Sequence, residues 1–230
     1  MYKRIGIVAG AGPEAGIDIW KKILLENRKI LGERFRGDID APHIVIHSVP
    51  QLGLAMNFSS HEDDLWLALK NALIAMDGQI DLVCIACNAL HAFTDRIYQL
   101  NLNMEFVSII DVVKEHVVSQ SLGTLGLLSI SAVMSLNPRT PYAPLQEITS
   151  VVTAPNHGEM DALIRAIKLT GEATRDLQDQ YESIVRRMNV EHVVLACTEL
   201  PLVMRPILGI TQIDASQLLA NALANKRLGR

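Results

Sequence analysis

Two stretches of this sequence carry one pattern, DLVCIACNAL at residues 81–90 and EHVVLACTEL at residues 191–200. Both contain a short apolar run that ends in Ala-Cys, and continuous Val, Ile and Leu runs are typical of strands buried on both faces of a parallel sheet. A second pair, RIGIVA at 4–9 and TLGLLS at 124–129, shares a glycine between apolar residues. The two pairs predict two similar lobes, and chance similarity between buried strands is the alternative explanation.

The rest of the chain alternates between strand-like runs and segments long enough for helices. Helices are predicted at residues 13–31, 60–78 and 159–169, and in the second Ser60 can cap the first turn and Gly78 can end the helix. This alternation predicts an α/β fold. The predicted strands are residues 4–9, 43–49, 80–87, 105–110, 124–130, 147–153, 191–197 and 210–214.

The composition argues against several classes of protein. The 230 residues carry a net charge of −4 with no basic block, which argues against a nucleic-acid partner. No apolar stretch approaches the roughly 20 residues that span a bilayer, and the N-terminus has no secretory signal pattern. Three cysteines are too few for a disulfide framework. We therefore expect a cytoplasmic globular protein with a small-molecule ligand and no membrane partner.

The glycine-rich loop GAGPEA follows the first predicted strand and raises the question of a nucleotide. Gly10, Gly12 and Ala15 fit a dinucleotide pattern, but His47 and Ser48 stand at the end of the next strand, where that pattern needs an acidic residue. There is no Walker sequence either. Glycine amides and a helix N-terminus also suit a carboxylate, so we predict a carboxylate cradle; a tight turn without a ligand is the alternative.

Cys87 and Cys197 each end a predicted strand, where ligands bind in parallel α/β sheets. A helix that starts just after a cysteine favours the thiolate over the thiol. Two such cysteines, one in each lobe, could serve as matched proton carriers on opposite sides of one carbon. Cys84 is three residues before Cys87 in a strand and so faces the other side of the sheet, where it is expected to fill the core.

At this point the sequence resembles the cofactor-independent aspartate/glutamate racemase superfamily. GAGPEA (10–15), CNALH (87–91) and ACTELP (196–201) are similar to the family signatures GGMGPEA, CNTAH and GCTELP, in the same order along the chain. The resemblance implies two Rossmann-like lobes with parallel four-stranded sheets, related by a pseudo-twofold axis, with the active site in the cleft between them. It also implies a homodimer and catalysis without any cofactor or metal. We expect the lobes at residues 1–103 plus 212–230 and at residues 104–211.

The resemblance also implies roles for individual residues. Cys87 and Cys197 would be the two acid/base groups: one thiolate removes the α-proton while the other thiol protonates the opposite face. Asn88 and Thr198 would bind the α-carboxylate and ammonium of the substrate. His91 could orient or polarise a thiol, or could be an ordinary helix histidine. Further positions expected at the substrate are Gly10, Ala11, Gly12, Gln51, Ala89, Ser131 and Glu199.

The sequence departs from the family pattern where substrate carboxylates would be bound. Gly16 and Ala89 stand where the family has threonine, and Ala55 stands where aspartate racemases have an arginine. A carboxylate removed from water needs such a cationic partner. The side chain of the substrate therefore stays open, and the substitute cations available are His157, Arg139 and Lys168.

Three functions fit these observations. The first is an amino-acid racemase or epimerase that uses the two cysteines. The second is another isomerase of the same superfamily, a hydantoin racemase or a cis–trans isomerase of a small dicarboxylate. The third is a non-catalytic binding protein for a small molecule, motivated by the missing hydroxyl groups and arginine. Exchange of the α-proton with solvent separates the enzymes from the binding protein.

Overall fold

The computed structural model describes residues 2–230 and divides into two compact units. One unit comprises Met1–Val112 and Ser216–Arg230, and the other comprises Val113–Ala215. We expected the chain to cross near residues 103–104 and 211–212. In the structure the divisions fall inside helix α4 (Ile109–Ser119) and at the first residue of helix α9 (Ala215–Arg227), so a helix carries the chain through each crossing.

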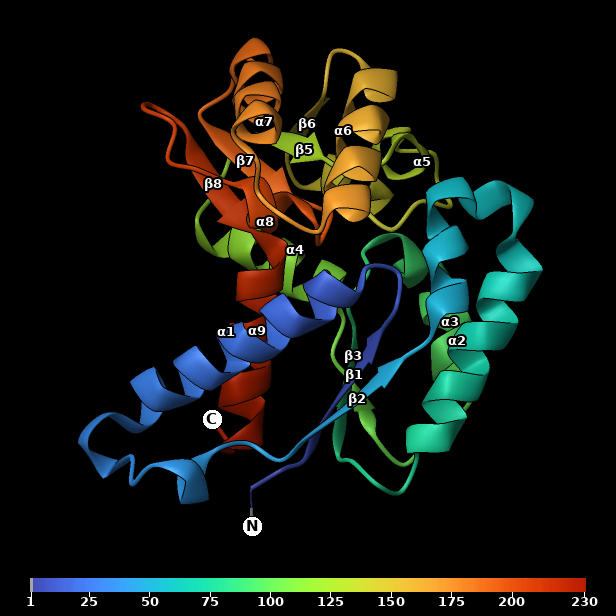
Figure 1. The fold of residues 1–230 in the computed structure, drawn as a ribbon, viewed down its shortest axis with the longest axis vertical. Coiled ribbons are helices and arrows are strands. Elements are labelled where there is room, and N and C mark those ends of the chain that lie inside the picture. The colour runs from blue at the N-terminus through green and yellow to red at the C-terminus, as the bar shows by residue number, and fades with distance from the viewer. Residues whose placement is uncertain (1) are drawn as a thin grey trace. The chain divides into compact units, whose positions relative to one another are not determined.

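The first unit is built on a four-stranded parallel sheet in the order β2-β1-β3-β4. Figure 1 shows α1 (Pro13–Leu31) and α9 on one side of this sheet and α2 (Glu62–Met76) on the other. Side chains of α2 form one apolar core cluster with the sheet, and Leu65, Leu69 and Leu73 are fully buried in it. The strands are β1 (Ile5–Ala9), β2 (Ile44–Ser48), β3 (Leu82–Ile85) and β4 (Glu105–Phe106).

The second unit repeats this topology with the strand order β6-β5-β7-β8, again all parallel. Its two longest helices, α6 (His157–Thr170) and α7 (Arg175–Arg187), contact each other and lie side by side in Figure 1. The strands are β5 (Thr124–Leu128), β6 (Ser150–Thr153), β7 (His192–Leu195) and β8 (Thr211–Asp214). The prediction of an α/β fold with two parallel four-stranded sheets is thus confirmed.

The remaining elements are short except for the 3₁₀ helix η3 (Pro50–Ser60), which has 11 residues. They are helices α3 (Thr94–Tyr98), α5 (Ser131–Met134) and α8 (Leu200–Val203), and the 3₁₀ helices η1 (Gly32–Arg34), η2 (Asp38–Asp40), η3 (Pro50–Ser60), η4 (Ala89–Phe93) and η5 (Ala143–Glu147).

Two local predictions were wrong. The strand expected at residues 105–110 ends after Phe106, because Ser108 accepts a hydrogen bond from the amide of Asp111 (3.3 Å) and so starts helix α4. Ser60 does not cap α2, because it belongs to η3; the residue before the helix is His61, whose side chain makes no capping hydrogen bond.

The two sheets place equivalent residues in the same register. Val8 of β1 pairs with Ile85 of β3, and Leu128 of β5 pairs with Leu195 of β7. The residue that follows β3 and the residue that follows β7 each donate an amide to the first strand of their unit: Ala86 N–H bonds Val8 O and Ala196 N–H bonds Leu128 O, both at 2.8 Å. The residue after each alanine is a cysteine, so the sequence repeat is also a repeat of backbone hydrogen bonding.

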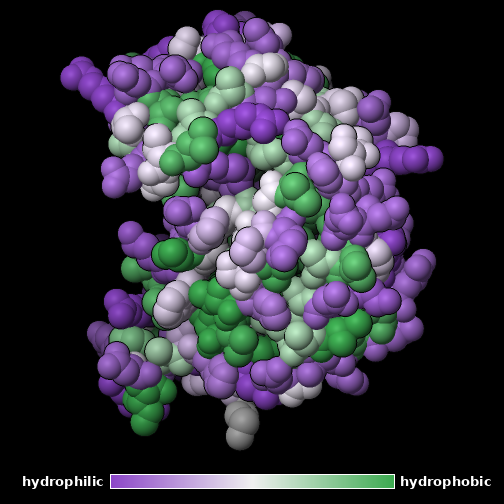
Figure 2. Space-filling model, turned by 45° about the vertical axis from the view of Figure 1, so that its right-hand side comes forward, coloured by the Kyte–Doolittle hydropathy of each residue, from purple (hydrophilic) through white to green (hydrophobic). Residues whose placement is uncertain are grey.

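The surface mixes apolar and polar side chains, as the face in Figure 2 shows. Leu67 and Ile74 on the outer side of α2 are 57% and 49% exposed. No helix within residues 2–230 combines the length and the apolar character that a bilayer span requires.

Candidate active site

The glycine loop of the first unit follows β1 and contains one position that only glycine can occupy. Gly10 has a φ of +112°, and a Cβ there would stand 2.1 Å from the carbonyl oxygen of Val49. Gly12 precedes α1, and Pro13 occupies its first turn, as the loop-to-helix pattern predicts. Farther along α1, Gly16 replaces the family threonine, and a Cβ there would lie 2.7 Å from Cβ of Ala9. Close packing of α1 on β1 therefore accounts for the absence of this hydroxyl group.

Cys87 lies two residues beyond the end of β3 and is half-buried against the apolar core. Asn88 and Ala89 come next, are both buried, and lead into η4. Because β1 and β3 are neighbouring parallel strands, the glycine loop and Cys87 lie at the same edge of one sheet. The helix that we expected after Cys87 is the short 3₁₀ helix η4, and a helix of this length has a weaker dipole to favour the thiolate than a longer α-helix has.

His91 is buried, and both nitrogens of its ring have backbone partners. Nε2 accepts a hydrogen bond from the amide of Ile109 (3.2 Å), which can only donate, so the ring proton stands on Nδ1 and is donated to the carbonyl oxygen of Cys87 (3.0 Å). Burial lowers the pKa of His91 to about 4, and hydrogen bonds with the backbone of Cys87 and Asn88 oppose this shift only in part. His91 is thus a neutral tie between the backbone of Cys87 and the start of α4.

The burial of His91 in its neutral form makes the stability of the fold depend on pH. An unfolded histidine has a pKa of about 6.5, whereas that of His91 is about 4, so the unfolded chain binds more protons between these two values. The stabilisation is complete above pH 6.5 and is lost as the pH falls, by up to about 3 kcal/mol. Asp40 and Asp81 titrate below this window, because hydrogen bonds from arginines hold their pKa values at about 2.

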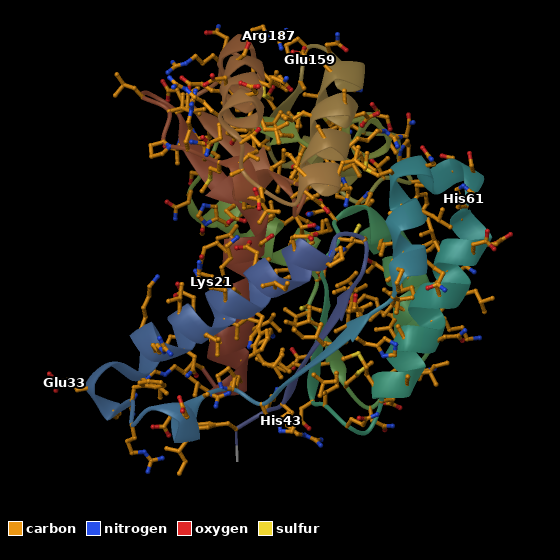
Figure 3. The ribbon with its side chains drawn as sticks, viewed as in Figure 1. Lys21, Glu33, His43, His61, Glu159 and Arg187 are labelled. Atoms are coloured by element: carbon orange, nitrogen blue, oxygen red, sulfur yellow. The ribbon has the colours of Figure 1, made fainter. Side chains whose placement is uncertain are left out.

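We expect His91→Gln to lower the free energy of unfolding at neutral pH and to remove most of its decrease between pH 6.5 and 4.5. Urea unfolding followed by the fluorescence of Trp20 and Trp66 measures this, because both tryptophans lie in the same unit as His91. His61→Gln is the matched control, since that side chain lies at the surface (Figure 3). A wild-type pH dependence in H91Q would show that another group titrates.

In the second unit, Cys197 lies two residues beyond the end of β7 and is 7% exposed. Its thiol donates a hydrogen bond to Oε2 of Glu199 (3.0 Å), and the hydroxyl of Thr198 donates to the same oxygen (3.3 Å). The ammonium of Lys168, from α6, forms an ion pair with Oε1 of Glu199. Glu199 is 3% exposed, so this carboxylate is a buried junction between a thiol, a hydroxyl and a lysine.

The surroundings of Cys197 favour the protonated sulfur. Burial raises the pKa of the Cys197 thiol well above its usual value, and the negative charge of Glu199 adds to this effect. The ammonium of Lys168 and a backbone hydrogen bond from Glu199 act in the opposite direction. Burial alone raises the pKa of Cys84 to about 12, as expected for a sulfur that fills the core within β3.

Ser131 is the first residue of α5 and is held by a carboxylate of the protein itself. Its amide donates to Oδ1 of Asp161 (2.8 Å) and its hydroxyl donates to Oδ2 (2.6 Å). Ser129, the other serine near this turn, is buried and donates its hydroxyl to the carbonyl of Ala196 (2.6 Å). Both hydroxyl groups therefore have protein partners beside the strand end that carries Cys197.

The other predicted site residues lie in different surroundings, some exposed and some in the core. Gln51 lies in η3 with an exposed side chain, whereas Ala11 and Ala55 both belong to the buried core cluster of the first unit. Ala55 therefore stands in apolar surroundings, where an arginine would need a different packing. Of the substitute cations, Arg139 is exposed, and His157 contacts the hydroxyl of Thr153 through Nε2 (3.1 Å).

Two partners of site residues were not predicted from the sequence. Asp161 accepts hydrogen bonds from Ser131, and Lys168 forms the ion pair with Glu199. Asp161 and Lys168 are seven residues apart on α6, a spacing that puts two side chains on the same face of a helix. That spacing was available in the helix predicted for residues 159–169. Across residues 2–230, no group of three or more His, Cys, Asp and Glu side chains is placed to hold a metal ion.

Solved structures with the same fold include several racemases. An aspartate racemase from Picrophilus torridus has a TM-score of 0.82 at 21% identity, covering 98% of this chain and 94% of that one. An aspartate racemase homologue from Pyrococcus horikoshii OT3 has a TM-score of 0.74 at 26% identity, covering 98% and 99%. A glutamate racemase from Francisella tularensis, solved with D-glutamate, has a TM-score of 0.65 at 16% identity, covering 99% and 82%.

Comparison with family models gives a match to one family, described as Asp/Glu/Hydantoin racemase, over residues 8–223. The match includes the glycine loop, both cysteine motifs and the helix that carries Asp161 and Lys168. No curated protein sequence matches the chain significantly. Because the family match covers nearly the whole chain, and the fold is that of solved racemases, this chain belongs to the Asp/Glu/Hydantoin racemase family of isomerases.

Proposed function

We propose that this protein is a pyridoxal-phosphate-independent amino-acid racemase in which Cys87 and Cys197 are the two proton-transfer groups. The observation that carries the proposal is the equal placement of the two cysteines. Cys87 stands two residues beyond β3 and Cys197 two residues beyond β7, the third strand of each unit, and each follows an alanine whose amide bonds the first strand of that unit at 2.8 Å. Membership of the racemase family supports it.

The reaction needs one thiolate and one thiol around a single α-carbon. The thiolate takes the α-proton, and the electron pair of the C–H bond passes to the α-carbon and its carboxylate. The second thiol then gives its proton to the opposite face. The product is the other enantiomer, and one proton has moved between the cysteines. The reverse reaction uses the same groups in exchanged roles, so both sulfurs are needed in both directions.

Substrate recognition in this proposal combines backbone and buried polar groups. The glycine loop and Asn88 of the first unit, and Thr198 of the second, are the groups we assign to the α-carboxylate and the ammonium. The substrate class is a small amino acid. A homodimer is part of the proposal too, and light scattering of the purified protein tests it.

Deuterium exchange tests the function directly. The protein is incubated in D₂O without pyridoxal phosphate, with L- and D-amino acids that include aspartate and glutamate, and α-deuterium is read by mass spectrometry. We expect exchange with at least one amino acid, and its side chain identifies the substrate. Cys84→Ala is the matched control and should keep this exchange, since Cys84 is a core residue.

The same assay distinguishes the alternatives. Exchange only with a 5-substituted hydantoin would identify a hydantoin racemase, and conversion of maleate without amino-acid exchange would identify a cis–trans isomerase. A ligand that binds in calorimetry but never acquires deuterium would indicate a binding protein and overturn the proposal.

A further inference from the structure

Glu199 stands between Cys197 and Lys168 in a way that sets the protonation of the thiol. We propose that Glu199 is a positioning residue that keeps Cys197 in the thiol form, and that Lys168 limits the strength of this effect. The inference rests on the proposed function in one respect only, namely that the Cys197 thiol serves as a proton donor in catalysis. The contacts themselves lie within Val113–Ala215, a single compact unit.

The geometry makes Glu199 an acceptor for the sulfur. Cys197 Sγ and Glu199 Oε2 are 3.0 Å apart, within one turn of chain after β7, and both residues are buried. The other carboxylate oxygen is occupied by the ammonium of Lys168. The hydroxyl of Thr198 adds a second donor to Oε2 at 3.3 Å. The carboxylate is therefore fixed from both sides, and the S–H bond has one direction in which to donate.

The electrostatic balance follows from the groups that surround the sulfur. The carboxylate of Glu199, on the same loop as Cys197, disfavours the thiolate, and the ammonium of Lys168, on α6, favours it. Tyr142, which precedes η5, is fully buried, and the charge of Cys197 acts on its phenol. Asp161, also on α6, is bound by Ser131 at 2.6 and 2.8 Å. Glu199 and Lys168 are thus the two charges that act directly on the thiol, with opposite signs.

This arrangement gives the two cysteines different starting roles. Cys197 begins as the proton donor, so abstraction begins at the other thiol group, Cys87, in its thiolate form. After Cys197 has given its proton away, a thiolate stands beside the carboxylate of Glu199, and Lys168 is the group that makes this state accessible. Removing Glu199 should therefore lower the pKa of the Cys197 thiol, and removing Lys168 should raise it.

Alkylation of Cys197 by iodoacetamide, resolved by mass spectrometry of the tryptic peptide, tests this on the full-length protein without substrate. We expect Glu199→Gln to raise the alkylation rate at a fixed pH near 8 and Lys168→Met to lower it. A charge within hydrogen-bonding distance moves a pKa by about one unit or more, and the lower nucleophilicity of a more acidic thiolate offsets part of the gain. The expected changes are therefore about threefold to tenfold in each direction.

The exposed ion pair between Glu159 on α6 and Arg187 on α7 supplies matched controls (Figure 3). Glu159→Gln and Arg187→Met change the same kinds of charge in the same unit, and both should leave the rate at Cys197 within about twofold of wild type. A loosened structure would raise the rate in both Glu199→Gln and Lys168→Met, and this result would overturn the proposal. So would a Glu199→Gln rate equal to that of Glu159→Gln.

The outcome is independent of turnover. Suppose that the two variants change the alkylation rate in opposite directions but the protein exchanges no substrate proton: the role of Glu199 is then upheld and the racemase function is rejected. If the protein does exchange deuterium but the alkylation rates do not change in this way, the racemase function is upheld and the role of Glu199 is rejected.

Discussion

Replacing either Cys87 or Cys197 with serine should lower the rate of racemisation about 10³-fold in both directions. A positioned acid or base contributes about 10² to 10⁴-fold to a proton transfer, and a serine hydroxyl neither ionises like a thiol nor gives up its proton as readily. Both transfers lie on the path from either enantiomer, so loss of one sulfur slows both directions. Circular dichroism, or a chiral assay where the optical change is small, measures the initial rates from each enantiomer.

The double variant gives the sharper result. If the cysteines act as one unit, Cys87→Ser with Cys197→Ser should lose little more activity than either single variant, because the losses of such groups do not add. Cys84→Ala controls for loss of a thiol as such. Additive losses, or a single variant that keeps a tenth of the wild-type rate in both directions, would reject the paired-thiol mechanism.

The second large effect is expected at Gly10, where an alanine should lower the free energy of unfolding by at least about 3 kcal/mol. Two causes act together. The φ of +112° is unfavourable for a residue with a side chain, and the added Cβ would meet the backbone of Val49 at 2.1 Å. Backbone atoms of the residue after β2 cannot turn aside as a flexible side chain can, so the strand end itself would have to move.

Gly78→Ala separates the two causes. Gly78 also has a positive φ, +77°, but a Cβ there meets nothing within 4 Å, so its alanine variant should lose only about 1 kcal/mol. Urea unfolding followed by tryptophan fluorescence compares the pair, since both glycines and both tryptophans belong to the same unit. Equal losses in the two variants would mean that Val49 adapts and that the close approach is not a constraint.

The repeated strand pattern predicted two similar α/β lobes, and the resemblance to the racemase superfamily implied a parallel four-stranded sheet in each. Buried parallel strands leave a continuous apolar signal, and the spacing of DLVCIACNAL and EHVVLACTEL already placed Cys87 and Cys197 at equivalent positions. The structure confirms two parallel four-stranded sheets in which those two residues follow the same register. Local rules were weaker at the element ends, where Ser60 was a plausible cap but the chain formed η3 instead.

The partners of the polar side chains were decided by tertiary structure. Lys168 and Glu199 are 31 residues apart in the sequence, and Ser131 and Asp161 are 30 residues apart. Local periodicity does not indicate which helix face meets which strand end. His91 had two interpretations in the sequence, and packing against the amide of Ile109 selected a buried, neutral ring. The sequence by itself determined the order of strands and helices and the position of the cysteines after their strands, but not the exact ends of every strand, because the order depends on short-range apolar patterns. The tertiary structure alone decided which charges act on the thiol of Cys197, because its burial and its hydrogen bond to Glu199, and the ion pair of Glu199 with Lys168 on α6, arise only when the chain folds.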